Sequence, residues 1–351
     1  MENNQNTNTL DSLVNFPILL APMVGITHAA MRKSLSKFIP TEARTIWPTE
    51  MLSSRKIPDQ KLDELPQTVK WSGDTNLCPQ ILGNQETHIR NTIIKLEQWG
   101  AKAIDINMGC SVKKALRHNY GVSLMGDTEY ASSVVRMAKR SSKLPVSVKL
   151  RAGLQKDLSY LLDFTQSLVD AGASWLCLHP RLSTEGRKGS ADWSQIKYLK
   201  DNLSVPIIGN GDIQTFQDIQ DMFEQTNCDA VMIGRVLTAK PWLLTEYAKH
   251  KGFKLTQKQE ELIPSNGQQR SKIYGEYLYD FVVNCYDLFE EDDALKRVRF
   301  FVKVGHPWLN FGHKLYKEIH KLTNKDDLLK FLETYFKNSC LSQSDRTQLR
   351  Y

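Results

Sequence analysis

Polar side chains of types that bind ligands or catalyse reactions follow one short apolar stretch after another in this sequence. In chain order they are Pro22-Met23, Glu50, Gln80, Asn107, Lys149 with Arg151, His179 with Arg181, Asn210-Gly211-Asp212 and Gly234-Arg235. One or two such residues would only cap the next helix, and Asp212 suits that role. Seven of the eight stretches end in this way. That number predicts a ligand that is large and polar along one edge.

The last two of these stretches have the composition of a phosphate site. Gly211 and Gly234 would let backbone N–H groups approach a phosphate, and Arg235 would add a charge-assisted contact. Lys149 would place a cation beside a flavin ring, which carries negative charge when reduced. Gln80 would hydrogen-bond the pyrimidine edge of that ring. The alternative is that both glycines only make tight turns.

The apolar stretches themselves predict parallel strands buried on both faces. They span 16–23, 43–50, 78–83, 101–109, 144–151, 174–181, 205–212 and 229–235. Amphipathic segments of helical period lie between most of them. In the segment at 87–100, the residues expected on one side are Ile89, Ile93, Ile94 and Leu96.

Eight strands alternating with helices over about 220 residues match a (β/α)8 TIM barrel, in which strand-end residues meet at one mouth. The alternative, an open doubly wound sheet, normally carries GxGxxG after its first strand, and this sequence lacks that motif. After Trp242 the pattern becomes long and helical. We therefore expect a polar N-terminal tail over 1–15, a barrel over 16–243, a polar linker over 244–264 and an all-helical C-terminal domain over 265–351.

The composition favours a globular protein with a polyanionic partner. The chain has 351 residues, a net charge of +7 and 41% hydrophobic residues. A basic balance suits RNA through neutralisation of phosphates, although many soluble proteins are mildly basic without such a role. We expect no membrane span, no secretory signal and no bound metal, because neither long apolar runs nor CxxC or Cys/His zinc spacings occur. A cytoplasmic monomer without disulfides is the expectation.

Six segments, taken together and in order, resemble the dihydrouridine synthase family. They are LAPMVGITHAAMR, PQILG, DINMGC, VSVKLRAG, LHPR…ADW and VPIIGNGDI…CDAVMIGR, and they cover about residues 16–243. The resemblance implies an FMN-containing barrel with a C-terminal helical domain that binds tRNA. It also implies reduction of the C5–C6 double bond of uridine in tRNA, with NADPH or NADH as the reductant.

Carried onto this sequence, the resemblance implies roles for individual residues. FMN contacts are implied for Pro22, Met23, Val24, Gln80, Lys149, His179, Asn210, Gly211, Asp212, Gly234 and Arg235. Substrate contacts are implied for Asn107, Lys149, Arg151 and Arg181. Cys110 matches the proton donor of the family. By itself, Cys110 would be interpreted as a small buried hydrophobic residue, because cysteine prefers burial.

The chemistry agrees with these roles. Reduced FMN would deliver hydride to C6 of the uracil, and donors at Asn107 and Arg151 would stabilise the charge that develops over C5 and the C4 oxygen. A thiol with a pKa near ~8.5 is protonated at neutral pH and suits protonation of C5. A basic loop after Cys110 (Lys113, Lys114, Arg117 and His118) would grip phosphate or simply be solvated.

One departure from the family lies beside Cys110, and three alternative functions stay open. Ser111 replaces the proline that usually follows the cysteine of the family, which bears on how the substrate docks. The alternatives are an FMN-dependent barrel enzyme acting on a small molecule, a dihydrouridine synthase acting on another RNA, and a relative that binds RNA without catalysis. The basic helical region disfavours the first of these, and the retained Cys110 disfavours the last.

Overall fold

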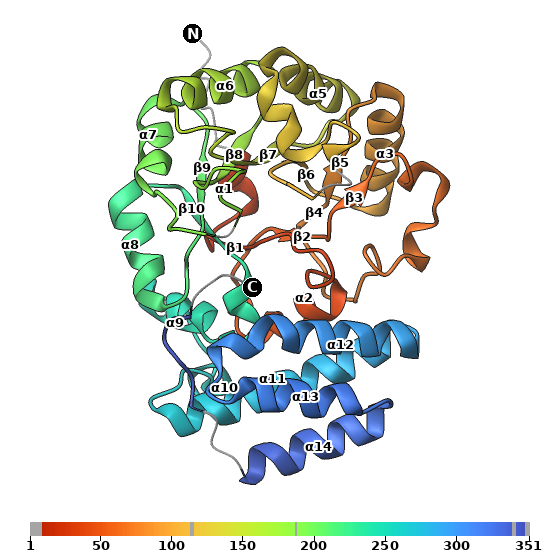
Figure 1. The fold of residues 1–351 in the computed structure, drawn as a ribbon, viewed down its shortest axis with the longest axis vertical. Helices are drawn as coiled ribbons and strands as arrows, with labels where there is room; N and C mark the ends of the chain where they lie inside the picture. The colour runs from red at the N-terminus through yellow and green to blue at the C-terminus, as the bar shows by residue number, and fades with distance from the viewer. Residues whose placement is uncertain (1–8, 113–115, 187, 339–341, 348–351) are drawn as a thin grey trace.

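The computed structural model describes residues 9–112, 116–186, 188–338 and 342–347, and it confirms a TIM-like barrel with a helical C-terminal region (Figure 1). The eight-stranded parallel sheet has the order β1-β10-β9-β8-β7-β6-β5-β3. Its strands are β1 (Ile18–Leu20), β3 (Leu52–Ser53), β5 (Gln80–Leu82), β6 (Ile104–Met108), β7 (Val146–Arg151), β8 (Trp175–His179), β9 (Ile207–Asn210) and β10 (Ala230–Ile233). The curled sheet is surrounded by helices, and the helices after residue 266 lie together beside it.

The second and third predicted strands differ from the prediction: each is replaced by two short pieces, and the barrel strand β3 lies just beyond the predicted range 43–50. A separate pair, β2 (Trp47–Pro48) with β4 (Leu77–Cys78), precedes β3 and β5. Pro48 is the last residue of β2, and Pro79 separates β4 from β5; proline has no N–H to give to a ladder. At the seam with β1, the Thr45 hydroxyl donates to the Ile18 carbonyl at 2.6 Å. A side chain therefore supplements strand pairing where the barrel closes.

Outer helices follow most strands, and the predicted amphipathic segments form those over 86–99, 128–141, 158–170 and 216–226. The outer helices are α2 (Ala29–Ser36), α3 (Glu86–Trp99), α5 (Thr128–Ser141), α6 (Leu158–Asp170), α7 (Ser194–Asn202) and α8 (Phe216–Thr226). In α3, Ile89, Ile93 and Leu96 are buried as expected, whereas Ile94 is 39% exposed. Gly100 ends α3 with φ +104°, the left-handed conformation that glycine adopts without strain.

The N-terminal segment, which was predicted as a polar tail, contains a short helix with a buried residue. Residues 1–8 lie outside the described part, but Thr9–Leu13 form α1. Leu10 is 1% exposed and belongs to a cluster of barrel-interior residues that includes Leu19, Trp175 and Ala230. Because Trp175 and Ala230 begin their strands, α1 covers the end of the barrel opposite the carboxyl ends of the strands. The carboxyl ends of the strands are left for a ligand.

The segment expected as a polar linker differs from that prediction. It contains α9 (Leu243–His250) and the short α10 (Gln257–Glu260), and Leu244 and Tyr247 are buried. Tyr247 packs edge-on against Phe16 with ring centroids 5.4 Å apart. Because α9 follows β10, it is the outer helix after the last strand of the barrel. The C-terminal region then consists of α11 (Gly267–Leu288), α12 (Glu291–Gly305), α13 (Gly312–Lys321) and α14 (Lys325–Asn338).

Candidate active site

Two adjoining cavities open at the carboxyl ends of the strands. One measures about 380 Å³ and the other about 610 Å³, and both are lined by Pro22, Val24, Lys149 and His179. These volumes lie in the range of about 300–1,000 Å³ that is typical of small-molecule sites. Every residue expected to contact FMN lines the larger cavity, except Gln80, which lines the smaller one. The strand-end residues therefore converge as the barrel topology predicts.

The smaller cavity brings Cys110 together with the groups expected beside the substrate. Cys110 is half-buried and lines this cavity with Asn107, Lys149 and Arg151. Its backbone N–H donates to the Asn107 side-chain oxygen at 2.8 Å. Gly121, at φ +61°, packs so closely that a Cβ there would lie 2.4 Å from the Cys110 carbonyl oxygen. The loop thus holds the thiol at the mouth of the barrel.

A chain of hydrogen bonds runs from the barrel interior to the loop that carries Cys110. The Ser147 hydroxyl and the Gln80 amide donate to the buried Asp105 carboxylate at 2.6 and 2.7 Å. The Asn107 amide donates to Gln80 Oε1 at 2.8 Å, and Asn107 Oδ1 accepts from the loop. Burial raises the pKa of Asp105, although both hydrogen bonds oppose that rise. No motif assigned a role to Asp105.

Four cations surround His179. Burial, followed by the charges of Lys149, Arg151, Arg181 and Arg235, lowers the pKa of His179 to about 2. The imidazole is therefore neutral near pH 7 and adds no charge of its own. Lys149 Nζ donates to Asn210 Oδ1 at 3.0 Å, which holds the ammonium between the two cavities. Cations gathered around a neutral ring suit an anionic ligand.

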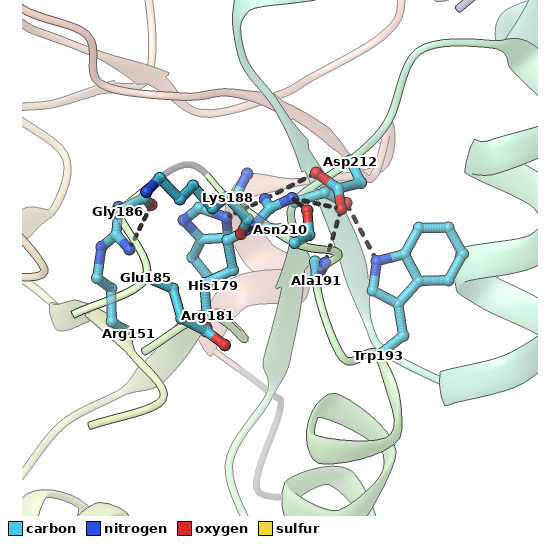
Figure 2. A network of polar contacts seen from close by, with 12 residues as sticks. Arg151, His179, Arg181, Glu185, Gly186, Lys188, Ala191, Trp193, Asn210 and Asp212 are labelled. Atoms are coloured by element: carbon cyan, nitrogen blue, oxygen red, sulfur yellow. Dashed lines mark hydrogen bonds and ion pairs between the residues drawn. The ribbon is translucent and has the colours of Figure 1, made fainter. Parts of the chain in front are cut away.

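Arg181 differs from its expected role as a substrate contact. The side chain is 4% exposed and forms an ion pair with Asp212 at 2.7 Å (Figure 2). It also donates to the carbonyls of Lys188 and Gly189 at 3.2 and 2.7 Å. Its donors thus face protein acceptors, although its edge lines the larger cavity. Arg181 fixes a loop instead of presenting a free guanidinium.

Asp212 is likewise not the helix cap that its position suggests. Besides Arg181, its carboxylate accepts from the Ala191 backbone N–H at 2.6 Å. The cap of α8 is supplied by Thr215, paired reciprocally with Asp218 in a capping box. Asp212 therefore joins the loop after β9 to the loop after β8.

Arg151 reaches the same loop from β7. Its Nη1 donates to the Gly186 carbonyl at 3.0 Å (Figure 2) and to the Leu182 carbonyl at 3.1 Å. Arg151 also lines the smaller cavity, which it shares with Cys110. Arg151 thus combines a loop contact with a position in the same cavity as the thiol.

The larger cavity has one wall that the sequence did not predict. The barrel contributes the two glycines of the expected phosphate site, Gly211 at φ +121° and Gly234. A Cβ on Gly211 would lie 2.8 Å from the His179 ring, so only glycine fits there. The opposite wall comes from the helical region and consists of Phe300, Lys303, Val304 and His306.

Other expectations concern features outside this site. Among the described residues, no group of three or more His, Cys, Asp or Glu could hold a metal, and no helix is long and apolar enough to cross a membrane. The five cysteines in the described ranges are free, and Cys340 lies outside them. Of the basic loop, Lys113 and Lys114 also lie outside the described residues.

Comparisons with known proteins agree with the resemblance. The sequence model of the family described as dihydrouridine synthase (Dus) matches residues 19–302. A probable tRNA-dihydrouridine synthase of Rickettsia bellii is 31% identical over 230 residues, 65% of this chain and 69% of the relative. One of Aquifex aeolicus is 32% identical over 244 residues, 68% of this chain and 74% of the relative. tRNA-dihydrouridine synthase B of Shewanella oneidensis is 29% identical over 285 residues, covering 80% and 84%.

Proposed function

The chain belongs to the dihydrouridine synthase family, and from that premise we propose that it reduces the C5–C6 double bond of uridine in tRNA with FMN and NADPH. Family membership makes it a flavin-dependent oxidoreductase. The observation that carries the finer proposal is the position of Cys110, which shares one cavity with Asn107, Lys149 and Arg151.

The larger cavity fits FMN by its own chemistry. Gly211, Gly234 and Arg235 line this cavity together, where backbone N–H groups and the guanidinium would bind the phosphate. Lys149 and His179 line both this cavity and the smaller one, and they would face the ring. When bound, FMN would supply the hydride that is added to C6 of the uracil.

The residues of the smaller cavity would complete the reduction. The Cys110 thiol would give its proton to C5, and the thiolate left behind would be stabilised by the charges of Lys149 and Arg151. Asn107 and Arg151 would donate hydrogen bonds to the uracil oxygens as negative charge develops there. A uridine inside a folded tRNA must leave its stack to reach this depth, so base extrusion is part of the proposal.

NADPH, or NADH in its place, would serve as the reductant that regenerates the reduced flavin. tRNA is proposed as the substrate on the printed names of the relatives and on the basic balance of the chain. The helical region would contribute to tRNA binding.

The test separates proton donation from flavin chemistry. In Cys110→Ala, we expect uridine reduction to fall by at least ~100-fold, which is the scale of a lost general acid. Reduction of the bound flavin by NADPH should stay within about twofold of the wild type, because the thiol takes no part in that half-reaction. Dihydrouridine formed in unmodified tRNA and the flavin absorbance report the two steps separately. Wild-type dihydrouridine formation in Cys110→Ala would contradict the role of the thiol, and a protein that binds no FMN would contradict the function.

A further inference from the structure

The larger cavity is closed on one side by the end of α12, outside the barrel. Phe300, Lys303 and Val304 of α12 line it, and so does His306 of the 3₁₀ helix η5 (His306–Trp308). They share it with Gly234 and Arg235, the residues expected at the flavin phosphate. A helical region that only bound RNA would have no need to reach this point.

The same part of α12 packs directly on the turn that carries Arg235. This turn is the 3₁₀ helix η4 (Arg235–Thr238), which follows β10. Gly305 approaches it so closely that a Cβ would lie 3.0 Å from Thr238 Oγ1 and 3.1 Å from the Thr238 carbonyl oxygen. The buried Tyr277 hydroxyl of α11 donates to the Leu237 carbonyl at 3.1 Å. Two helices of the C-terminal region therefore hold η4, the turn that carries Arg235.

The loop after β9, which contains Gly211, is also held by contacts from the C-terminal region. Gln214, three residues beyond Gly211, is buried, and its side-chain oxygen accepts from the Trp308 indole N–H at 3.1 Å. The same oxygen accepts from the Thr347 backbone N–H at 2.8 Å. The loop after β9 and the turn after β10 thus both depend on contacts from residues beyond 300.

Lys303 is the cation in this wall that is available to a ligand. Within the described ranges, its ammonium has no hydrogen-bond or ion-pair partner, and the side chain is exposed at the cavity. His306 cannot take its place, because burial lowers the pKa of that imidazole and keeps it neutral. Its Nδ1 is already engaged with the Lys303 carbonyl at 2.8 Å.

We propose that the helical region completes the flavin site, with Lys303 binding the phosphate of FMN and Trp308 positioning the glycine loop after β9. The inference rests on the proposed function, because the phosphate is that of FMN. Lys303 is a binding residue, whereas Trp308 acts only through Gln214 and is a positioning residue.

The test compares FMN with riboflavin, which has the same ring and ribityl chain but no phosphate. Full-length protein saturated with either flavin is diluted, and the recovery of free-flavin fluorescence gives the dissociation constant. In Lys303→Gln, we expect FMN to bind roughly five- to tenfold more weakly, as for one lost charge-assisted contact. Riboflavin binding should be unchanged. The matched control is Lys296→Gln on the same helix, an exposed lysine 3.6 Å from Asp293, which should change neither.

Trp308→Phe keeps the buried ring but removes the indole donor. We expect it to weaken FMN more than riboflavin, because the loop after β9 would be loosened at the phosphate end. The proposal is overturned if the ratio of the dissociation constants for FMN and riboflavin is the same in Lys303→Gln as in the wild type, including the case in which both flavins bind equally more weakly. Failure of the proposed function has a different signature, because the wild-type protein would then bind neither flavin.

Discussion

The Glu50 carboxylate lies 2.8 Å from the Arg297 guanidinium, and this ion pair joins the barrel to α12. The two side chains are only 3% and 11% exposed. The second carboxylate oxygen accepts from the Gly25 backbone N–H at 2.6 Å. Since Gly25 follows Pro22-Met23-Val24, one carboxylate connects a wall of the larger cavity to the helical region. The guanidinium also lies 4.6 Å from the centroid of the Phe289 ring.

Removing only the arginine should be strongly destabilising. Arg297→Met leaves a buried carboxylate without its partner, which costs about 3–5 kcal/mol in the free energy of unfolding. The double variant Glu50→Gln, Arg297→Met has no buried charge, and the oxygen of the introduced amide can still accept from the Gly25 N–H. We expect it to recover more than half of that loss. Urea unfolding at pH 7 measures both variants, and a loss below about 1 kcal/mol in the single variant would mean that the pair behaves as a surface one.

Asp105 should act on Cys110 through two intervening amides. The Asp105 side chain accepts from the Gln80 amide N–H, which fixes the end of that amide that faces inward, and Gln80 in turn orients Asn107. Asp105→Ala should lower kcat for uridine reduction by roughly 10- to 100-fold, the cost of a misplaced catalytic group. Asp105→Asn should keep most activity, because its carbonyl oxygen still accepts from Gln80.

The discriminating measurement for Asp105 is the comparison of the two half-reactions. Flavin reduction by NADPH should fall much less than uridine reduction in Asp105→Ala. Equal losses in both half-reactions would instead indicate a general disturbance of the barrel. Full activity of the alanine variant would exclude any positioning role.

The convergence of the site was predictable because it follows from topology. In a parallel barrel all strands end at one mouth, so Asn107, Lys149 and Arg151 had to lie near each other once their strands were identified. The motif then distinguished Cys110 from Cys177, whose burial raises its pKa to about 12. Composition alone does not separate these two cysteines.

The orientation of side chains and the contribution of distant elements were not predictable in this way. Arg151 ends β7 and Arg181 lies two residues beyond β8, but the direction of the Arg181 side chain is set by the carbonyls of a loop whose course the sequence does not encode locally. Lys303 follows an ordinary helical pattern, and nothing in that pattern indicates contact with β10. The sequence signal for a turn near Lys303 was Pro307, because proline ends a helix close to a turn.

Arg181 should prove to be a structural residue. Arg181→Met removes the cation paired with the Asp212 carboxylate, which among the described residues then keeps only the Ala191 N–H, so we expect a loss of about 3–5 kcal/mol in stability and a lower flavin content. The control is Lys156→Met, which removes an exposed ion pair to Asp192 at 3.4 Å and should cost less than about 1 kcal/mol. Thermal unfolding and the ratio of flavin to protein absorbance report the two effects. A stable, flavin-loaded Arg181→Met with a raised KM for tRNA would restore the role expected from the resemblance.

His28 should make the stability of the protein depend on pH. The ring is wholly buried against Phe281 and Phe289, and within the described residues neither ring nitrogen has a hydrogen-bond partner. Burial, and then the charges of Arg297 and Arg32, lower the pKa of His28 well below its ordinary value. The unfolded chain therefore binds a proton below pH ~6.5 that the folded chain does not. Stability is complete above that pH and falls as the pH decreases, by up to about 1.4 kcal/mol per pH unit.

His28→Leu removes this titration and keeps an apolar side chain between the two rings. At pH 7.5 we expect equal or greater stability, since two unpaired nitrogens leave the interior. Between pH ~6.5 and ~5 the loss of stability should be shallower than in the wild type by up to about 1.4 kcal/mol per pH unit. A slope remains in both proteins, because the pKa of His179 is lowered to about 2 and gives the same sign. Urea unfolding across this range is the measurement, and parallel curves for the two proteins would show that His28 is already protonated when folded.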